Sequence, residues 1–306
     1  MYGQSIDGFI RDMRPKPITR LLLHLANLAV IAFLLLPLLA VAIGSLQSEK
    51  SLQAATRSVL PPEWTLDNFR VILSGGTQKG AIFEQVTYLP DNVKKIHYAL
   101  FNSTIIAVAV TLATLVFASL SAYTVARLQL RWVVWLMNLN AFARFVPIIV
   151  LMIPLYVMFR QFGLLNSIWG VIIALTGFLV PYGILILAPY FSTVPRELEE
   201  AARIDGCSRF TAFVRITLPL SAPALVSYGA IVFIIAWNDL LIPLVLNNRA
   251  EFMTLPVVIA SLVGDVHVFF NLMMAICLLA LIPSVLLVLL LRRFVVQGLA
   301  VGGVKA

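Results

Sequence analysis

Charged side chains are sparse in this chain of 306 residues, and one segment, residues 193–223, concentrates them. Three carboxylates follow Pro195, an order that predicts a helix start, because proline is tolerated in a first turn and carboxylates are favourable beside the positive end of the helix dipole. They are Glu197, Glu199 and Glu200. Such a segment offers charge pairing and docking rather than catalysis.

The same segment reads as two short helices joined by a turn. Glu199 and Arg203 lie four residues apart, in the favourable order for an ion pair along one helix. Asp205-Gly206 predicts the end of this helix, because glycine accepts the left-handed conformation of a C-terminal cap. A second amphipathic stretch begins near Phe210 and is expected to end at Leu218-Pro219. Because a plain reversal needs only about four to six residues, this longer elbow predicts a surface that a partner grips.

Polar groups inside apolar stretches are the second set of candidates. Arg144, preceded by Asn140, lies deep in one such stretch, where an ionisable side chain costs about 2.5–3.5 kcal/mol on insertion scales. It either lines a solute path or forms a structural ion pair. Trp237, Asn238 and Asp239 combine groups that hold sugar hydroxyls and stack on sugar rings. Their alternative role is an interfacial tryptophan anchor beside a solvated carboxylate.

Other catalytic or cofactor chemistry has little support in the sequence. Cys207 and Cys277 show no pairing pattern, and the three histidines lie far apart, so no metal site is predicted. No GxxxxGK[ST] phosphate-binding loop occurs, so the chain is not expected to bind ATP. We therefore predict that it is not an enzyme.

Composition fixes the environment in which these residues act. Hydrophobic residues make up 61% of the chain and charged residues only 12%, with a net charge of +8. A soluble domain carries about 25% charged residues, so a cytosolic enzyme or a nucleic-acid binder is excluded. The sequence predicts an integral membrane protein.

Six apolar stretches are long enough to cross a bilayer, which takes roughly 20 residues. The first is too long for the apolar core of a cleaved signal peptide and is expected to be a retained span. The expected fold is all-α: a polytopic membrane protein of six transmembrane helices. The stretches are Leu21–Leu46, Tyr98–Arg127, Trp132–Phe159, Ile168–Phe191, Ala222–Leu246 and Phe269–Leu291.

The distribution of Lys and Arg places both termini and the 193–223 elbow in the cytoplasm, because short cytoplasmic loops are enriched in these residues. The expected parts are a cytoplasmic N-terminus (1–20), a six-helix domain (21–294) and a cytoplasmic tail (295–306). The domain includes an outside loop (47–97) and a cytoplasmic coupling loop (193–221). The outside loop is either a solvated connector or a docking surface, and the later outside loop, 247–265, is either a reversal or a docking loop.

A motif of seven residues within the elbow resembles the EAA loop of ABC importer permeases. The pattern is Glu-Ala-Ala, three residues, Gly, nine residues, then Ile-x-Leu-Pro, with every spacing kept. Asp205, beside the glycine, can pair with basic groups as Glu200 can. The matching residues are Glu200, Ala201, Ala202, Gly206, Ile216, Leu218 and Pro219.

Further segments make nearly the whole chain from Thr65 similar to the permease subunits of maltose-type carbohydrate importers. The outside loop departs from that family by about twenty extra residues around positions 75–95. The segments are Thr65–Phe69, Phe101–Ser103, Ala122–Arg127, Ile153–Tyr156, Gly163–Ser167, Trp237–Asp239 and Gly298–Lys305.

The resemblance implies a type I ABC importer permease in a bacterial inner membrane, moving a sugar or sugar derivative by alternating access. It implies four kinds of partner: a second, similar permease, two cytosolic ATPase subunits, an extracytoplasmic solute-binding protein and a small carbohydrate. No cofactor is expected on this chain, since ATP and magnesium would be held by the ATPases. The alternative is a stand-alone secondary transporter of a small polar solute, which would have no use for the elbow.

Overall fold

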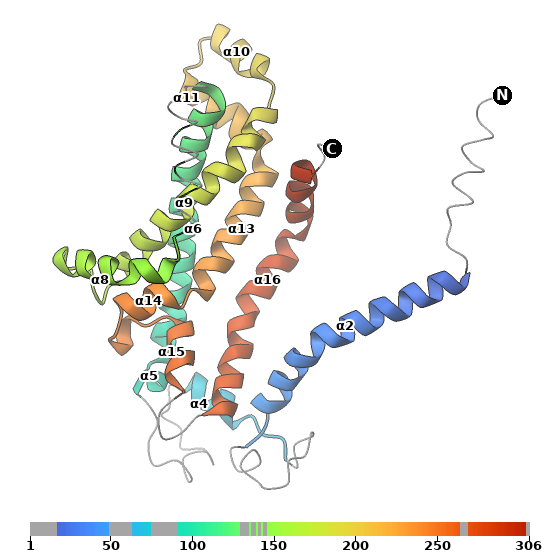
Figure 1. Ribbon diagram of the computed structural model, residues 1–306, viewed down its shortest axis with the longest axis vertical. Helices are drawn as coiled ribbons and strands as arrows, with labels where there is room; N and C mark the ends of the chain where they lie inside the picture. The colour runs from blue at the N-terminus through green and yellow to red at the C-terminus, as the bar shows by residue number, and fades with distance from the viewer. Residues whose placement is uncertain are drawn as a thin grey trace.

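The computed structural model describes residues 17–48, 63–74, 91–128, 135, 139, 142, 146–263 and 269–303. The elements within these residues are helices, which confirms the all-α prediction (Figure 1). Four of them are long and apolar enough to cross a membrane. These four match the first, second, fourth and sixth predicted spans. They are α2 (Pro17–Ser45), α6 (Ile96–Leu128), α9 (Ile168–Thr193) and α16 (Phe270–Gly303).

The fifth predicted span, Ala222–Leu246, is broken in the structure. Helix α13 (Ala222–Asn238) stops before Asp239, and α14 (Leu241–Leu246) follows as a separate helix. Pro243 explains the break, because proline has no N–H for the carbonyl four residues earlier and its ring would clash with that carbonyl. That carbonyl belongs to Asp239, whose backbone is extended and whose carboxylate accepts a hydrogen bond from the N–H of Ile242 at 3.1 Å. This predicted span is therefore two helices separated at Asp239 rather than one continuous helix.

The third predicted span, Trp132–Phe159, lies largely outside the described residues. Its described end forms η1 (Ile148–Leu151) and then α8 (Met152–Gln161), a short helix that lies across the bundle in Figure 1. A fifth crossing is obtained if α13 and the helical stretch 209–220 before it, bent by 79°, count as one broken span. Six spans remain a prediction, while a multi-pass membrane protein is confirmed.

The core of the bundle lies where α6, α9 and α13 meet. Ala118, Ala122 and Ala126 form a buried row of small residues on α6. Gly183 of α9 lies so close to α6 that an added Cβ would be 2.3 Å from the Cβ of Ala118. Small residues allow this approach, which lets helices pack in a membrane without a hydrophobic driving force.

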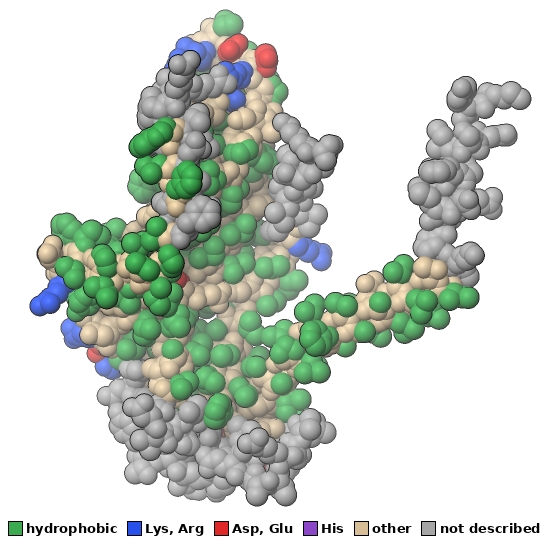
Figure 2. All heavy atoms as spheres, in the orientation of Figure 1, with side chains coloured by type: hydrophobic (Ala, Val, Ile, Leu, Met, Phe, Trp, Pro, Cys, Tyr) green, Lys and Arg blue, Asp and Glu red, His purple; other side chains and the backbone are tan. Residues whose placement is uncertain are grey.

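The outer layers are more open. Helix α16 packs on α13 and on α2, and α2 slants away from the bundle with its leucines exposed (Figure 1). Hydrophobic side chains cover α2 and α8, while acidic and basic side chains gather at the end that carries α10 (Figure 2). This distribution fits an apolar belt in contact with lipid.

Four short helices belong to the opposite end of the bundle, and Figure 1 labels three of them there, α4 (Asp67–Leu73), α5 (Asp91–Lys94) and α15 (Leu255–Ser261). Buried amides hold this end together: the side-chain N–H groups of Asn68 and Asn271 both donate to the backbone oxygen of Gln47, at 2.9 and 2.8 Å. These contacts join the end of α2 to the first of the four helices and to α16. The remaining short helix is η3 (Ala250–Phe252).

Candidate functional site

The elbow begins with α10 (Arg196–Ile204), which starts directly after Pro195. It ends as predicted at Asp205-Gly206. The N–H of Gly206 donates to the oxygen of Arg203 at 3.1 Å, and the N–H of Cys207 donates to that of Ala202 at 2.9 Å. This pair of bonds is a Schellman cap. Its left-handed position is Gly206, with φ of +90°.

The second half of the elbow is a bent helix. The Ser208 hydroxyl accepts the N–H of Thr211 at 3.1 Å and begins α11 (Arg209–Ala212). A π-helical turn, η2 (Phe213–Thr217), and the short α12 (Leu218–Leu220) follow. The sequence predicts that the second helix ends at Leu218-Pro219. In the structure, Pro219 instead lies in the first turn of α12. The chain bends at Ser221 into α13.

The eight predicted coupling residues lie mostly on the outside of the elbow. Three are half-buried, namely Ala202, Ile216 and Leu218. The others are exposed: Glu200, Ala201, Asp205, Gly206 and Pro219. The outer surface of α10 thus presents one carboxylate near its middle and another at its end, which suits docking to a basic surface.

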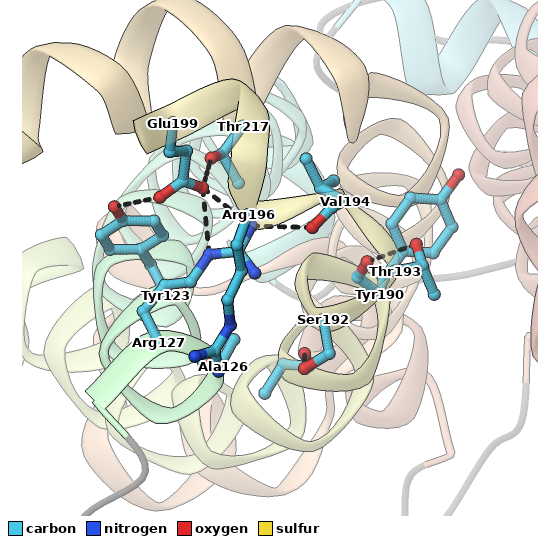
Figure 3. A network of polar contacts seen from close by, with 11 residues as sticks. Tyr123, Ala126, Arg127, Tyr190, Ser192, Thr193, Val194, Arg196, Glu199 and Thr217 are labelled. Carbon is cyan, nitrogen blue, oxygen red and sulfur yellow. Dashed lines mark hydrogen bonds and ion pairs between the residues drawn. The ribbon is translucent and has the colours of Figure 1, made fainter. Parts of the chain in front are cut away.

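Sequence reasoning named Glu199 but missed its contacts with α6 and η2. It lies underneath α10, between α6 and η2 (Figure 3). The guanidinium of Arg127 donates to its Oε1 through Nε at 3.0 Å and Nη2 at 2.8 Å. The Tyr123 hydroxyl donates to Oε2 at 2.8 Å, and the Thr217 hydroxyl donates to Oε1. The predicted pairing of Glu199 with Arg203 is therefore wrong, because Arg127 of α6 takes its place.

The charged groups of this cluster are largely shielded from water. The side chains of Arg127 and Glu199 are each 10% exposed. Burial by itself raises the pKa of the Glu199 carboxyl, but the hydrogen bonds from Thr217, Arg127 and Tyr123 outweigh it, so its pKa lies below the ordinary value. Glu199 is ionised at neutral pH. The sequence contained one indication of this cluster. Arg127 ends the second predicted span, and the glutamates of the elbow are predicted to lie on the same side of the membrane.

The base of the elbow is also bonded to α6. Arg127 Nη2 donates to the backbone oxygen of Val194 at 3.1 Å, and Arg196 donates to that of Ala126 at 3.4 Å. Beside these contacts lies an open depression of about 450 Å³, whose lining includes Arg203 and Arg209. The underside of the elbow is thus fixed, and its outer side is free to receive a partner.

The structure separates the three residues Trp237, Asn238 and Asp239. The indole of Trp237 is buried, donates to the oxygen of Ala280 at 3.0 Å and stacks on Phe233. The Asn238 amide donates back to Ile234 at 2.8 Å. Because the indole and the amide are bonded to the protein itself, the three groups do not converge on one ligand.

Asp239 alone of the three is among the residues lining a cavity of about 600 Å³ between η1, α9, α13 and α14. The other lining residues are mainly apolar, with the hydroxyl-bearing Tyr182 among them. One carboxylate in an apolar cavity is a plausible contact for a polar solute. Arg144 and Asn140, the other candidates for a solute path, lie outside the described residues.

The later outside loop is firmly fixed to the bundle. The Asn102 side chain of α6 donates to the oxygens of Glu251 and Met253 at 2.8 and 3.0 Å. Lys95 pairs with the Glu251 carboxylate at 2.6 Å, and this hydrogen bond holds the pKa of Glu251 below its ordinary value. The side-chain oxygen of Asn166 accepts the N–H of Arg249 at 3.0 Å. This loop is a rigid platform, and its role in docking remains a prediction.

In the part of the chain that the structure describes, no three His, Cys, Asp or Glu side chains lie together as a metal site would require. The expectation that this chain binds no cofactor stays a prediction.

Comparison with known proteins identifies what the elbow belongs to. The model of the family "Binding-protein-dependent transport system inner membrane component" matches residues 114–301. The trehalose transport system permease protein SugB of Mycobacterium tuberculosis is 32% identical over 278 residues, covering 90% of this chain and 94% of the relative. The sulfoquinovosyl glycerol transport system permease protein SmoH of Agrobacterium fabrum is 33% identical over 210 residues, covering 69% of this chain and 74% of the relative.

A solved structure is also similar. It is a chain in the crystal structure of a bacterial ABC transporter involved in the import of the acidic polysaccharide alginate, with a TM-score of 0.69. At 19% identity, the match covers 91% of this chain and 98% of that one. The two chains therefore share their overall fold.

Proposed function

The chain belongs to the family of binding-protein-dependent transport system inner membrane components, and on that premise we propose how it works in an ATP-driven importer of a sugar or sugar derivative. It is a permease subunit and not an enzyme. We propose that it pairs with a second, similar permease and changes between outward and inward access. ATP would be hydrolysed by two separate cytosolic ATPase subunits.

The observation that carries this proposal is the folded elbow. Its exposed side presents Glu200 and Asp205 on a short helix, while its underside is bonded to α6 through Glu199. Leu198 and Phe210, exposed apolar side chains of the elbow, fit a cleft in a partner better than they fit water. A stand-alone secondary transporter would leave this helix without a role.

The sugar is proposed from the relatives and from the chemistry of the cavity. Two of the relatives are permease proteins of transport systems named for trehalose and for sulfoquinovosyl glycerol. Sugars expose many hydroxyls, and the Asp239 carboxylate at the cavity of about 600 Å³ can accept hydrogen bonds from them. We propose that the solute passes this cavity, with Arg144 and Asn140 as further candidates along the path.

An extracytoplasmic solute-binding protein would deliver the sugar to the opposite end of the bundle. We propose that it docks on the platform formed by α15 and the loop held by Asn102 and Asn166. The exposed Arg249, whose guanidinium carbon lies 5.9 Å from the ring centre of Phe252, is held in place for such a contact.

The first test is purification of the tagged chain from its native membrane in mild detergent, followed by mass spectrometry. We expect an ATPase and a second permease to be recovered together with it. Their loss on replacing Gly206 by valine, with Gly177→Ala as the matched control, would tie the recovery to the elbow. Recovery of this chain alone would overturn the proposal in favour of a secondary transporter.

The solute path has its own test. Asp239→Asn keeps an oxygen that can cap α14 but removes the charge at the cavity. We expect weaker apparent affinity for the sugar that the proposed solute-binding protein delivers, whereas Asn238→Ala, outside the cavity lining, leaves it unchanged. Equal uptake by wild type and Asp239→Asn would exclude this carboxylate from the path.

A further inference from the structure

Two adjacent glutamates of α10 have opposite environments. Glu200 is exposed at the open depression beside α10, whereas the Glu199 side chain is 10% exposed and lies against α6 and η2. The outer glutamate is therefore available to a partner and the inner one is not. Glu199 needs a role other than contact with the ATPase.

The Glu199 carboxylate joins three elements that are far apart in sequence. Arg127 and Tyr123 belong to α6, Glu199 to α10 and Thr217 to η2, and Figure 3 shows them converging on the two carboxylate oxygens. The Tyr123 ring also packs on Phe213 of η2, with ring centres 4.5 Å apart. Both halves of the elbow are thus bonded to the last two turns of α6.

Directional bonds to a charged group are stronger than neutral ones and fix an angle as well as a distance. Replacing a whole buried ion pair by apolar packing of the same volume changes stability little, although removing one partner alone is costly. What the pair adds beyond packing is therefore a fixed geometry. The elbow is rigid where it meets α6, and the π-helical turn and the 79° bend before α13 lie just beyond that point.

We infer that the cluster of Glu199, Arg127, Tyr123 and Thr217 is a rigid joint that makes the elbow and α6 move as one body. Movement imposed on α10 is then passed to α6 and to α9, which packs along it. The bend at Ser221 lets α13 change its angle to them. Glu199 is a positioning residue in this mechanism, and the inference rests on the proposed function because the ATPase supplies the movement.

The test measures distances in the whole purified complex, without and with trapping by Mg-ATP and vanadate. Spin labels on cysteines introduced at the exposed Leu128 and Ile204 report on α6 against the elbow, in a background lacking Cys207 and Cys277. A second pair, at Leu128 and Ile231, reports on α6 against α13. We expect trapping to change the second distance and to leave the first unchanged.

Glu199→Gln should release the joint. We expect the 128–204 distance distribution to become at least twofold broader and to change on trapping, while the ATPase still copurifies. Glu197→Gln, an exposed residue of the same helix, is the matched control and should behave as wild type. If Glu199→Gln does not accumulate, Tyr123→Phe and Thr217→Val each remove one hydrogen bond and keep the ion pair, and each should broaden the distribution to a smaller degree.

The outcomes separate the two proposals. A wild-type 128–204 distance that changes on trapping, or variants with the wild-type distribution, overturns the rigid joint and leaves the importer intact. Loss of the ATPase from Glu199→Gln would assign this residue to docking and also overturn the joint. A wild-type complex without any ATPase overturns the proposed function, and the joint with it.

Discussion

Side chains one position apart in the elbow have unlike roles, because a helix turns by about 100° per residue. Glu199 points toward α6 and is fully bonded, whereas Glu200 is exposed to solvent. The charge of Glu199 is held in its ionised form by its partners, so the stability of the elbow depends on the protonation of that single carboxyl.

This dependence predicts an acid-sensitive contribution to stability. The pKa of Glu199 is lowered in the folded chain, so its stabilising effect is complete above the unfolded value of about 4.3 and is lost as the pH falls through the folded value. We expect Glu199→Gln to lower stability at pH 7 by about 1.5–3 kcal/mol, as for a lost hydrogen bond to a charged group. Thermal unfolding in detergent between pH 7.5 and pH 4 should show the gap from wild type closing below about pH 4.5.

Glu197→Gln should show no gap at any of these pH values, because Glu197 is exposed. A gap for Glu199→Gln that is the same at pH 4 as at pH 7 would contradict the assignment of the effect to this carboxyl.

Gly206 is a second single-residue constraint. Its φ of +90° is unfavourable for side chains, while no heavy atom lies within 4 Å of an added Cβ. Substitution therefore costs backbone strain of about 1–3 kcal/mol without a clash. We expect Gly206→Ala and Gly206→Val to reduce the amount of ATPase recovered per permease, and Gly206→Asn to reduce it least. Gly177→Ala, a helical site with equal space, should change nothing; wild-type recovery with Gly206→Val would refute the argument.

Helices α6, α9 and α13 pack closely because the residues at their contact are small. A Cβ on Gly183 would lie 2.3 Å from Ala118 and 2.7 Å from the ring of Tyr228. The Tyr228 hydroxyl donates to the oxygen of Leu179 at 2.7 Å, so the ring is not free to move aside. The spacing of all three helices is therefore sensitive to one methyl group.

We predict that Gly183→Ala destabilises the chain by about 1–3 kcal/mol through overpacking. Ala118→Gly, on the facing helix, should restore part of this loss, because it removes the nearest atom. The measurement is thermal unfolding of the purified chain in detergent for both single variants and the double variant. If the stability losses of the two single variants simply add in the double variant, residues 183 and 118 are not in contact.

The limits of sequence reasoning are clearest at the level of elements. The long apolar helices followed from length and hydropathy, and the end of α10 followed from Asp205-Gly206. The break at Asp239 was readable from Pro243, four residues later, but proline inside a membrane span is also compatible with a mere kink. The direction of Glu199 was not readable, because either of two adjacent glutamates could face α6 until the packing of α10 is known.

The whole molecule has two unlike polar ends separated by an apolar bundle. The elbow and the C-terminal end of α16 lie toward one end, and α4, α5 and α15 lie toward the other (Figure 1). The excess of Lys and Arg around the elbow predicts that this end lies in the cytoplasm. The shape and the charge distribution thus agree on one orientation, which the native cysteines can test.

Cys207 lies in the elbow directly after Gly206 and is half-exposed, whereas Cys277 lies within the apolar part of α16. We predict that a membrane-impermeant maleimide labels Cys207 only from the cytoplasmic side, and only when the ATPase is absent and leaves the elbow uncovered. Cys277 should stay unlabelled in both cases, because a charged reagent does not enter the hydrocarbon region. The measurement compares inside-out and right-side-out vesicles from cells that make or lack the ATPase, with Cys207→Ser as the control for background. Labelling of Cys207 in right-side-out vesicles would show that the bundle has the opposite orientation. The elbow would then lie outside the cell, where a cytosolic ATPase cannot bind it.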